Sequence, residues 1–213
     1  MKPYYEEPDV LLYLADSREA VQEISVESVI TDPVWPNAVA ELPGSRDPVG
    51  LFRDVARHFP SVAERVVVQL GCDSDPRFLC AMPDMPFLRT CWLEYVRPHY
   101  KGRLLYTGDV AYVFGEWPES RAGARVLPGR FIQHDASPRP EGHPCPRQLQ
   151  HVRWLCKWFG GASVLDPFCG SGTTAVACKQ LGIPFIGIEV EERYIDLAVR
   201  RVAGEPKPLM GVV

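Results

Sequence analysis

Several features that mark other classes of protein are missing from this sequence of 213 residues. It has no run of about 18 apolar residues, so no membrane-spanning helix is expected. The opening stretch MKPYYEEPDV lacks the basic start and apolar core of a secretory signal. The seven cysteines are odd in number and none form a CxxC pair, which predicts reduced thiols in a cytoplasmic protein.

A strong positive charge is also missing, because the formal net charge is -4. The charge is unevenly distributed, however, and residues 121–153 hold six arginines against two acids, a local balance of 6 − 2 = +4. A basic segment of this kind can attract a polyanion even when the whole chain is acidic. A solvated loop explains the same charges equally well, so both interpretations stay open.

Strand and helix patterns alternate along most of the chain. Apolar runs predict strands at 10–16, 26–32, 64–71, 163–166 and 184–189. Helical spacing predicts helices at 17–24 (with Ser17 as the cap), 47–59, 86–96, 146–159, 172–182 and 191–202. Residues 102–115 are typical of a hairpin or of two late strands. Residues 116–146 are rich in Pro, Gly and Arg, as expected of a long loop or insertion that could recognise the target.

This alternation predicts an α/β fold, a mostly parallel sheet with helices on both faces, formed by 1–213 as a single domain. The strands at 163–166 and 184–189 come too late in the chain to begin a sheet of their own. They can pair with the strands at 10–16 and 26–32, which would close one sheet in a circularly permuted order.

A glycine turn follows the strand at 163–166. Gly170 and Gly172 allow a tight turn and the close approach of a ligand to the backbone. Thr173 or Thr174 can cap the helix that follows, and the free N–H groups of that helix would attract an anion. Glu189 ends the next strand, where an acid can bind the two hydroxyls of a ribose. The pattern predicts a site for a nucleoside that carries a carboxylate or a phosphate.

NAD is one candidate ligand for such a turn. The sequence Asp166-Pro167-Phe168 before the first glycine argues against it, because the usual dinucleotide pattern runs from an apolar strand directly into glycine. A purely structural turn is the remaining alternative.

Four segments together resemble the DNA amino-methyltransferases, the N6-adenine and N4-cytosine group. DPFCGSGTT (166–174) resembles their S-adenosylmethionine motif, and GIEVEERYIDLAVRRV (187–202) resembles the segment after it. HPCPRQLQHVRWL (143–155) resembles the preceding His-Pro-x-x-Lys-Pro segment, and LYLADSREAVQEISVESVITDPVW (12–35) resembles the opening that ends in Asp-Pro-Pro-Tyr. The order, catalytic motif first and cofactor motif last, is that of the permuted β-type branch. The resemblance implies a Rossmann-like methyltransferase fold.

The resemblance also implies which residues bind S-adenosylmethionine. The methionine part would be surrounded by Asp166, Phe168, Gly170, Gly172 and Thr173. Glu189 would bind the ribose, Asp16 would lie near the adenine, and the segment before the turn would contribute His143 and Arg147. Two positions depart from the family pattern there, because Arg147 stands where Lys is usual and Gln148 where Pro is usual.

The segment TDPVWPN (31–37) would carry the chemistry. The amino nitrogen of a base is a poor nucleophile because its lone pair is delocalised into the ring. The Asp32 carboxylate and the Pro33 carbonyl would accept its two hydrogens, and Trp35 would stack on the base. Val34 departs from the family, which usually has a second Pro at that position.

The predicted function is therefore a DNA methyltransferase, restriction-modification or orphan, that acts on N6 of adenine. Asp rather than Ser at the first position of the catalytic motif favours adenine by analogy with the family. The predicted partner is DNA, with a homodimer doubling the basic contacts. Three alternatives stay open: an N4-cytosine enzyme, a catalytically inactive nucleic-acid-binding subunit, for which Val34 is the motive, and methylation of RNA or of a protein amide.

Two other features have simpler interpretations. His134, His143 and Cys145 could suggest a metal, but the sequence has no second ligand pair at zinc spacing, so no metal site is predicted. Cys169 lies inside the glycine turn without a histidine placed to activate it, so it is interpreted as a small buried residue.

Overall fold

A computed structural model describes residues 1–37, 42–119, 126–135, 142, 144 and 146–205. They form one sheet in the order β1-β2-β9-β8-β3-β4-β6-β5-β7. Its strands are β1 Tyr5–Glu7, β2 Val10–Leu14, β3 Val26–Thr31, β4 Ala63–Gly71, β5 Phe87–Lys101, β6 Leu104–Gly115, β7 Arg130–Ile132, β8 Val164–Asp166 and β9 Phe185–Glu189. The helices are α1 Ser17–Ala20, α2 Pro48–Ala56, α3 Phe59–Val62, α4 Leu149–Phe159, α5 Thr173–Leu181 and α6 Glu192–Gly204, with 3₁₀ turns η1 Val21–Glu23 and η2 Pro76–Ala81.

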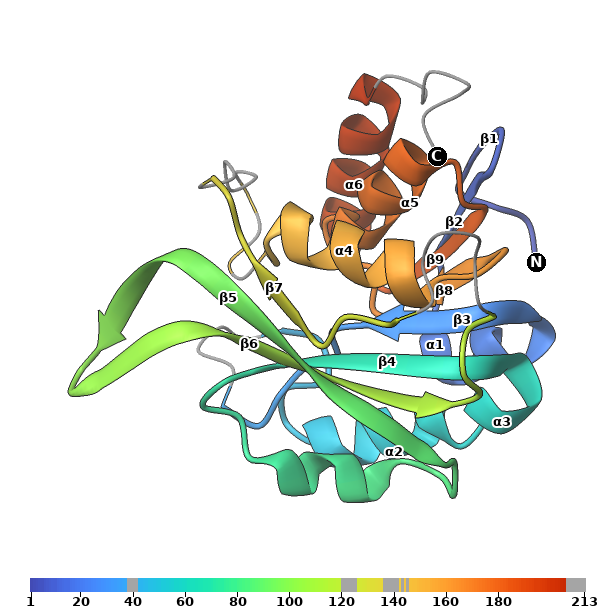
Figure 1. Cartoon of the computed structure of the whole chain (residues 1–213). Helices are drawn as coiled ribbons and strands as arrows, with labels where there is room; N and C mark the ends of the chain where they lie inside the picture. Colours follow the sequence, from blue (N-terminus) through green and yellow to red (C-terminus); the bar gives the residue numbers. More distant parts are fainter. Residues whose placement is uncertain (38–41, 120–125, 136–141, 143, 145, 206–213) are drawn as a thin grey trace.

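The permuted order of the sheet is confirmed. β8 and β9, from the end of the chain, lie between β2 and β3, from its beginning (Figure 1). The pairs β2–β9, β9–β8, β8–β3 and β3–β4 are all parallel. Because parallel strands expose their carboxyl ends at one edge, the loops after β2, β3, β8 and β9 meet there.

Helices cover both faces of the sheet, as predicted. α4, α5 and α6 pack on one face, where Leu155, Ala177 and Ile195 belong to one buried apolar cluster. α1, α2 and α3 lie on the opposite face, where Phe52 and Phe59 belong to a second cluster. This is the arrangement of a Rossmann-like fold.

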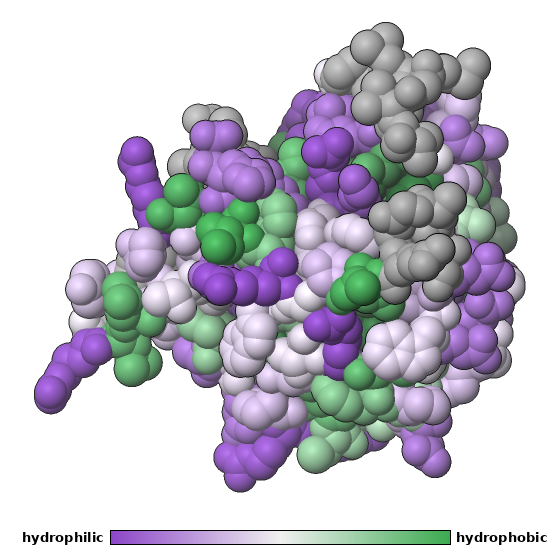
Figure 2. Space-filling model, viewed as in Figure 1, coloured by the Kyte–Doolittle hydropathy of each residue, from purple (hydrophilic) through white to green (hydrophobic). Residues whose placement is uncertain are grey.

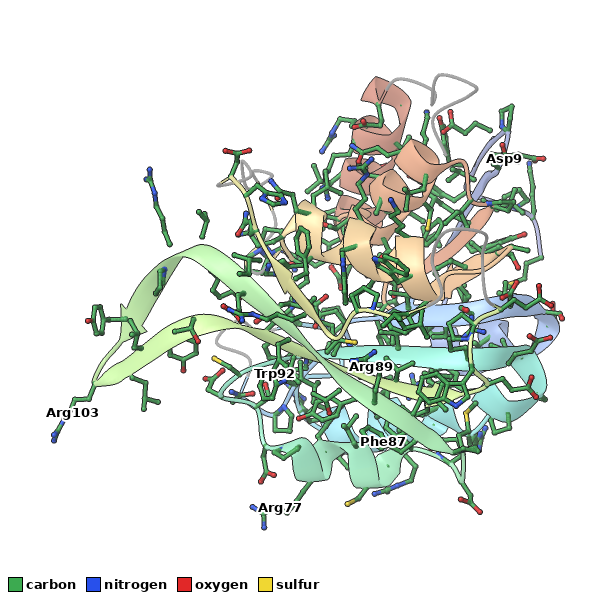
Figure 3. The ribbon with its side chains drawn as sticks, in the orientation of Figure 1. Asp9, Arg77, Phe87, Arg89, Trp92 and Arg103 are labelled. Atoms are coloured by element: carbon green, nitrogen blue, oxygen red, sulfur yellow. The ribbon has the colours of Figure 1, made fainter. Side chains whose placement is uncertain are left out.

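The helix predicted at 86–96 is wrong, because these residues belong to strand β5. Cys91 and Leu93 are fully buried while Trp92 between them is 55% exposed, so burial alternates with the two-residue period of a strand. Figure 3 shows Phe87, Arg89 and Trp92 along this strand. β5 pairs with β6 on one side and with β7 on the other, and these partners outweigh the local helical pattern.

The hairpin or pair of strands predicted within 102–115 is wrong, because residues 104–115 form the single strand β6. β6 pairs with β5 in a longer hairpin that extends beyond the body of the molecule (Figure 1). β4 pairs with β6 only as far as Gly71 opposite Asp109. Residues 95–107, which we call the arm, therefore continue past the carboxyl end of β4. β4 is parallel to β3, so the arm leaves the sheet at the edge where β3 ends.

Two local predictions also need correction. The segment 17–24 divides into α1 and η1, and the cap of α1 is Asp16 rather than Ser17: the Arg18 backbone N–H donates to Asp16 Oδ1 at 2.9 Å. Within the predicted loop 116–146, residues 130–132 form β7 and pair in parallel with β5. Among the described residues, no helix is long and apolar enough to cross a membrane.

Candidate functional site

A cavity of about 530 Å³ opens at the carboxyl edge of the parallel strands. Its wall includes Asp16 after β2, Asp32 after β3, Asp166 at the end of β8 and Glu189 at the end of β9. Ligands of parallel α/β sheets bind at this edge, where loops from several strands converge. The edge thus brings together four acids that are far apart in the sequence.

Most of the residues predicted for the site line this one cavity. They are Asp16, Asp32, Pro33, Trp35, Arg147, Asp166, Phe168, Gly170, Thr173 and Glu189. Gly172 does not belong to the lining, and His143 falls outside the described residues. The two predicted groups, one from each end of the chain, therefore share a single space.

The buried Asp166 carboxylate holds the glycine turn in place through hydrogen bonds. Its Oδ1 accepts from the Thr31 hydroxyl at 2.8 Å and from the Phe168 backbone N–H at 3.1 Å, and its Oδ2 accepts from the Thr174 hydroxyl at 2.6 Å. Burial raises the pKa of Asp166 to about 6, although these hydrogen bonds oppose the rise. The carboxylate fixes the turn to β3 and to the start of α5.

Glu189 is held by backbone groups. Gly170 N–H donates to its Oε2 at 2.8 Å, and the N–H groups of Val190 and Glu191 donate to its Oε1 at 2.9 and 2.8 Å. Burial raises the pKa of Glu189, and the three N–H groups oppose that rise by stabilising the carboxylate. Oε2 accepts only one of these bonds and keeps a lone pair, so the carboxylate can accept a hydrogen bond from a ligand in the cavity.

The helix cap predicted from the threonines is wrong. Gly172 is the N-cap of α5, without a side-chain hydrogen bond, and Thr173 is the first helical residue. Gly172 has φ +77°, and a Cβ there would lie 2.7 Å from Cβ of Ala198 on α6. Gly172 therefore allows α5 and α6 to pack closely, which is a role away from the cavity wall.

Arg147 lies against Asp32, in a contact that the sequence did not predict. Its Nε donates to Asp32 Oδ2 at 2.6 Å and its Nη2 donates to Asp32 Oδ1 at 2.9 Å. The guanidinium carbon also lies 3.8 Å from the centroid of a Trp35 ring. Arg147 thus contacts both side chains of the predicted catalytic segment.

Asp109, on β6, completes this cluster and was missed from the sequence. Its Oδ2 accepts from Arg147 Nη1 at 3.1 Å and from Gln69 Nε2 at 3.0 Å, and its Oδ1 accepts from the Tyr95 hydroxyl at 2.7 Å. The signal was a lone acid inside the apolar run LLYTGDVAYVFG, and Asp109 is only 4% exposed. Buried charges need partners of this kind.

Burial and the two carboxylates beside Arg147, those of Asp32 and Asp109, determine the charges of Asp32 and Arg147. Burial raises the pKa of Asp32 to about 7, against the lowering effect of the Arg147 charge. Burial acts to lower the pKa of Arg147, but Asp109 and Asp32 outweigh it and raise that pKa. Arg147 therefore stays a cation between two acids, and Asp32 is the group whose charge changes near neutral pH.

Trp35 is fixed at the cavity wall but lacks one polar partner. A Cβ at Gly71, the last residue of β4, would lie 2.9 Å from Cζ3 of Trp35, so the ring packs directly on that glycine. Its buried Nε1 has no hydrogen-bond partner within the described part of the chain. A buried unpaired donor at a cavity wall is compatible with a ligand that supplies the acceptor.

Cysteine and metal chemistry have little support at this site. Cys169 is 5% exposed, and burial raises the pKa of its thiol, so it stays protonated and packs as predicted. Searching the described residues finds no cluster of metal-ligating side chains. His143 and Cys145 lie outside those residues.

Known proteins match part of this chain in sequence and most of it in fold. Residues 129–200 match the N6/N4 family model described as DNA methylase. The predicted resemblance to the DNA amino-methyltransferases is confirmed. The Type II methyltransferase M.Cfr9I of Citrobacter freundii is 51% identical over 60 residues, which are 28% of this chain and 20% of that relative. The aligned part of the chain thus spans about a fifth of the relative's length.

Solved DNA methyltransferase structures agree over most of the chain. The M1.HpyAVI complex with SAM has a TM-score of 0.67 at 24% identity, covering 91% of this chain and 98% of that one. The cytosine-N4-specific PvuII DNA methyltransferase has a TM-score of 0.69 at 16% identity, covering 94% of this chain and 88% of that one. At these identities the likeness establishes the Rossmann-like methyltransferase fold.

Proposed function

We propose that this chain transfers a methyl group from S-adenosylmethionine to the exocyclic amine of a DNA base, at N6 of adenine. The observation that carries the proposal is the shared cavity. It places Asp32 and Trp35, at the end of β3, in the same space as the glycine turn and Glu189. A transfer reaction needs its donor and acceptor sites in contact, because proximity supplies much of the rate.

The cavity suits the cofactor in size and in chemistry. Its volume of about 530 Å³ is typical of small-molecule sites. Glu189 would accept hydrogen bonds from the ribose hydroxyls, and Asp16 would lie at the adenine. Gly170 lets the backbone approach closely, and the start of α5 at Thr173 would attract the carboxylate of the methionine part.

Asp32, Pro33 and Trp35 would act on the base. When bound, the cofactor supplies a methyl group on a positively charged sulfur. The Asp32 carboxylate and the Pro33 carbonyl would accept the two amino hydrogens and direct the nitrogen lone pair toward that methyl group. With its pKa raised to about 7, Asp32 can also hold the proton that the amine loses. Stacking on Trp35 would contribute about 1–3 kcal/mol.

The choice of adenine rests on Asp32 at the first position of the catalytic motif, which resembles the adenine enzymes. Cytosine N4 is the second candidate, because a cytosine-N4-specific enzyme is among the similar structures. The acceptor mechanism is the same for both bases. The base assignment and the mechanism can therefore be tested separately.

The arm supports DNA as the substrate. Arg97, Lys101 and Arg103 supply three cations between residues 95 and 107, and no acid is present there. Figure 2 shows hydrophobic residues beside a strongly hydrophilic one at the projecting end, and Leu104 is 60% and Leu105 50% exposed. Because the arm leaves the edge that holds Asp32, it would contact the duplex beside a flipped base. A homodimer, which we propose as the working form, would double these contacts.

Nucleoside mass spectrometry tests the proposal. Mixed-sequence unmethylated DNA is incubated with S-adenosylmethionine and the wild-type chain or Asp32→Ala at low salt. We expect N6-methyladenine with the wild type and none with the variant. N4-methylcytosine would replace the base assignment and keep the mechanism. Binding of the cofactor without any methylated base would instead favour a non-catalytic nucleic-acid-binding subunit. The substitution Val34→Pro would then test whether Val34 is the cause of the missing activity.

A further inference from the structure

Arg147 occupies two of the three groups that the proposed reaction assigns to the target base, the Asp32 carboxylate and the Trp35 ring. Its guanidinium bonds to both oxygens of Asp32, at 2.6 and 2.9 Å, and lies over Trp35 at 3.8 Å from the ring centroid. A flipped base is also a planar group with N–H donors on its edge. The arginine therefore makes the same two kinds of contact, a donor pair on the carboxylate and a flat face on the indole.

We propose that Arg147 covers the target-base pocket in the DNA-free chain and must leave Asp32 before a base can enter. This inference rests on the proposed function and adds a gating step to it. Each Asp32 oxygen keeps a second lone pair, so hydrogen bonding alone would not exclude a base. The position over the Trp35 ring does exclude it, because two planar groups cannot stack at the same place.

Asp109 can keep binding Arg147 after Arg147 has left Asp32. Arg147 Nη1 already donates to Asp109 Oδ2 at 3.1 Å, and the Gln69 amide and the Tyr95 hydroxyl hold that carboxylate in place. Arg147 can release Asp32 and keep Asp109, so its charge is never buried alone. The same retained contact would return it to Asp32 when the product leaves.

Only molecules whose pocket is open can bind the base, so the apparent association constant for DNA is the intrinsic constant multiplied by the open fraction. If about a tenth of the molecules are open, removing the cover lowers the KM for DNA by up to about tenfold. Removing the Arg147 charge has a separate effect, because that charge lowers the pKa of Asp32. A useful test must keep these two effects apart.

Two substitutions do so, measured on the alkaline plateau of each variant's own pH–rate profile, where Asp32 is ionised. Arg147→Gln removes both the charge and the planar fork. Arg147→Lys keeps the charge but can neither bind Asp32 through two nitrogens nor stack flat on Trp35. The KM and kcat for mixed-sequence unmethylated DNA are measured by methyl transfer, and circular dichroism melting checks that each variant folds.

We expect both variants to lower the KM for DNA by up to about tenfold. We also expect Arg147→Gln alone to shift the acidic limb of the pH–rate profile to higher pH, because loss of the Arg147 charge raises the pKa of Asp32. A variant that lowers kcat and leaves the KM unchanged would overturn the gate and show that Arg147 only positions Asp32, while the proposed function would stand. No methyl transfer by wild type or by either variant would overturn the proposed function and the gate together.

Discussion

At the residue scale, one carboxylate has two competing uses. Asp32 is bound by Arg147 in the DNA-free chain, whereas in the proposed reaction it accepts hydrogen bonds from the amine of the base. Burial and the neighbouring acids Asp109 and Asp166 favour its neutral form, and Arg147 favours its charged form. The protonation state of Asp32 is therefore the property of the site most sensitive to solution conditions.

We expect kcat/KM for methyl transfer to rise with pH and to level off above about 7. The pKa of Asp32 is raised to about 7, and only the ionised carboxylate can take the proton that the amine loses, so activity is lost as pH falls through that value. Below it the rate should fall about tenfold per pH unit, as for a single required ionisation. A profile that stays flat from acidic to alkaline pH would show that Asp32 remains ionised throughout, and the proposed titration would be wrong.

The sequence predicted individual site residues better than their contacts. Asp32 and Glu189 could be placed because each ends a strand, and strand ends of a parallel sheet meet at one edge. The pair of Arg147 and Asp32 could not, because 115 residues separate them and Arg147 lies outside any strand or helix. Asp109 was overlooked because a single acid in an apolar strand carries no motif.

At the element scale, α5 and α6 hold the cofactor side of the cavity together. Gly172 at the start of α5 packs on Ala198 of α6, and its φ of +77° suits glycine. Close packing here sets the direction of the first turn of α5, whose N–H groups face the proposed ligand. The spacing of the two glycines was predicted, but the helix contact behind the second depends on the tertiary fold.

We expect Gly172→Ala to lower the free energy of unfolding by about 1–3 kcal/mol. The new Cβ would lie 2.7 Å from Ala198 Cβ and would require a left-handed backbone. Urea denaturation measures the change. Gly204→Ala is the matched control, because a Cβ at the end of α6 meets no atom within 4 Å. Equal stability of the two variants would contradict this account of Gly172.

Strands were predictable where one pattern dominates. The runs at 10–14, 26–31 and 63–71 are apolar and rich in Val, Ile and Leu, and they form β2, β3 and β4. β5 was mistaken for a helix because its first residues fit both periods. Pairing with β6 and β7 makes these residues a strand, and β7 was not predicted from the sequence.

At the scale of the whole molecule, an acidic chain presents a cationic arm. The net charge of -4 would repel DNA at long range, whereas the sequence of the arm holds Arg97, Lys101 and Arg103 and no acid. Figure 3 shows Arg103 at the far end of the hairpin. The predicted basic segment 121–153 lies partly outside the described residues. The arm is a second basic segment, and it leaves the sheet at the edge where β3 ends.

We expect the double variant Arg97→Ala, Arg103→Ala to weaken DNA binding and to reduce the slope of log K against log salt by about 1.8, at about 0.9 per phosphate contact. Fluorescence anisotropy across a salt series measures both quantities. Arg77→Ala is the control, because its side chain is 86% exposed and lies apart from the arm in Figure 3. An unchanged slope in the double variant would remove the arm from the DNA-binding surface.

We propose that one cavity binds the cofactor through Glu189 and holds the amine of the target base at Asp32. Isothermal titration calorimetry of S-adenosylmethionine into wild type, Glu189→Gln and Asp32→Asn tests it most directly. We expect the wild type to bind, Glu189→Gln to bind about tenfold more weakly, a loss of ~1.4 kcal/mol, and Asp32→Asn to bind like the wild type. No binding to the wild type, or an equal loss in both variants, would contradict this division of the cavity.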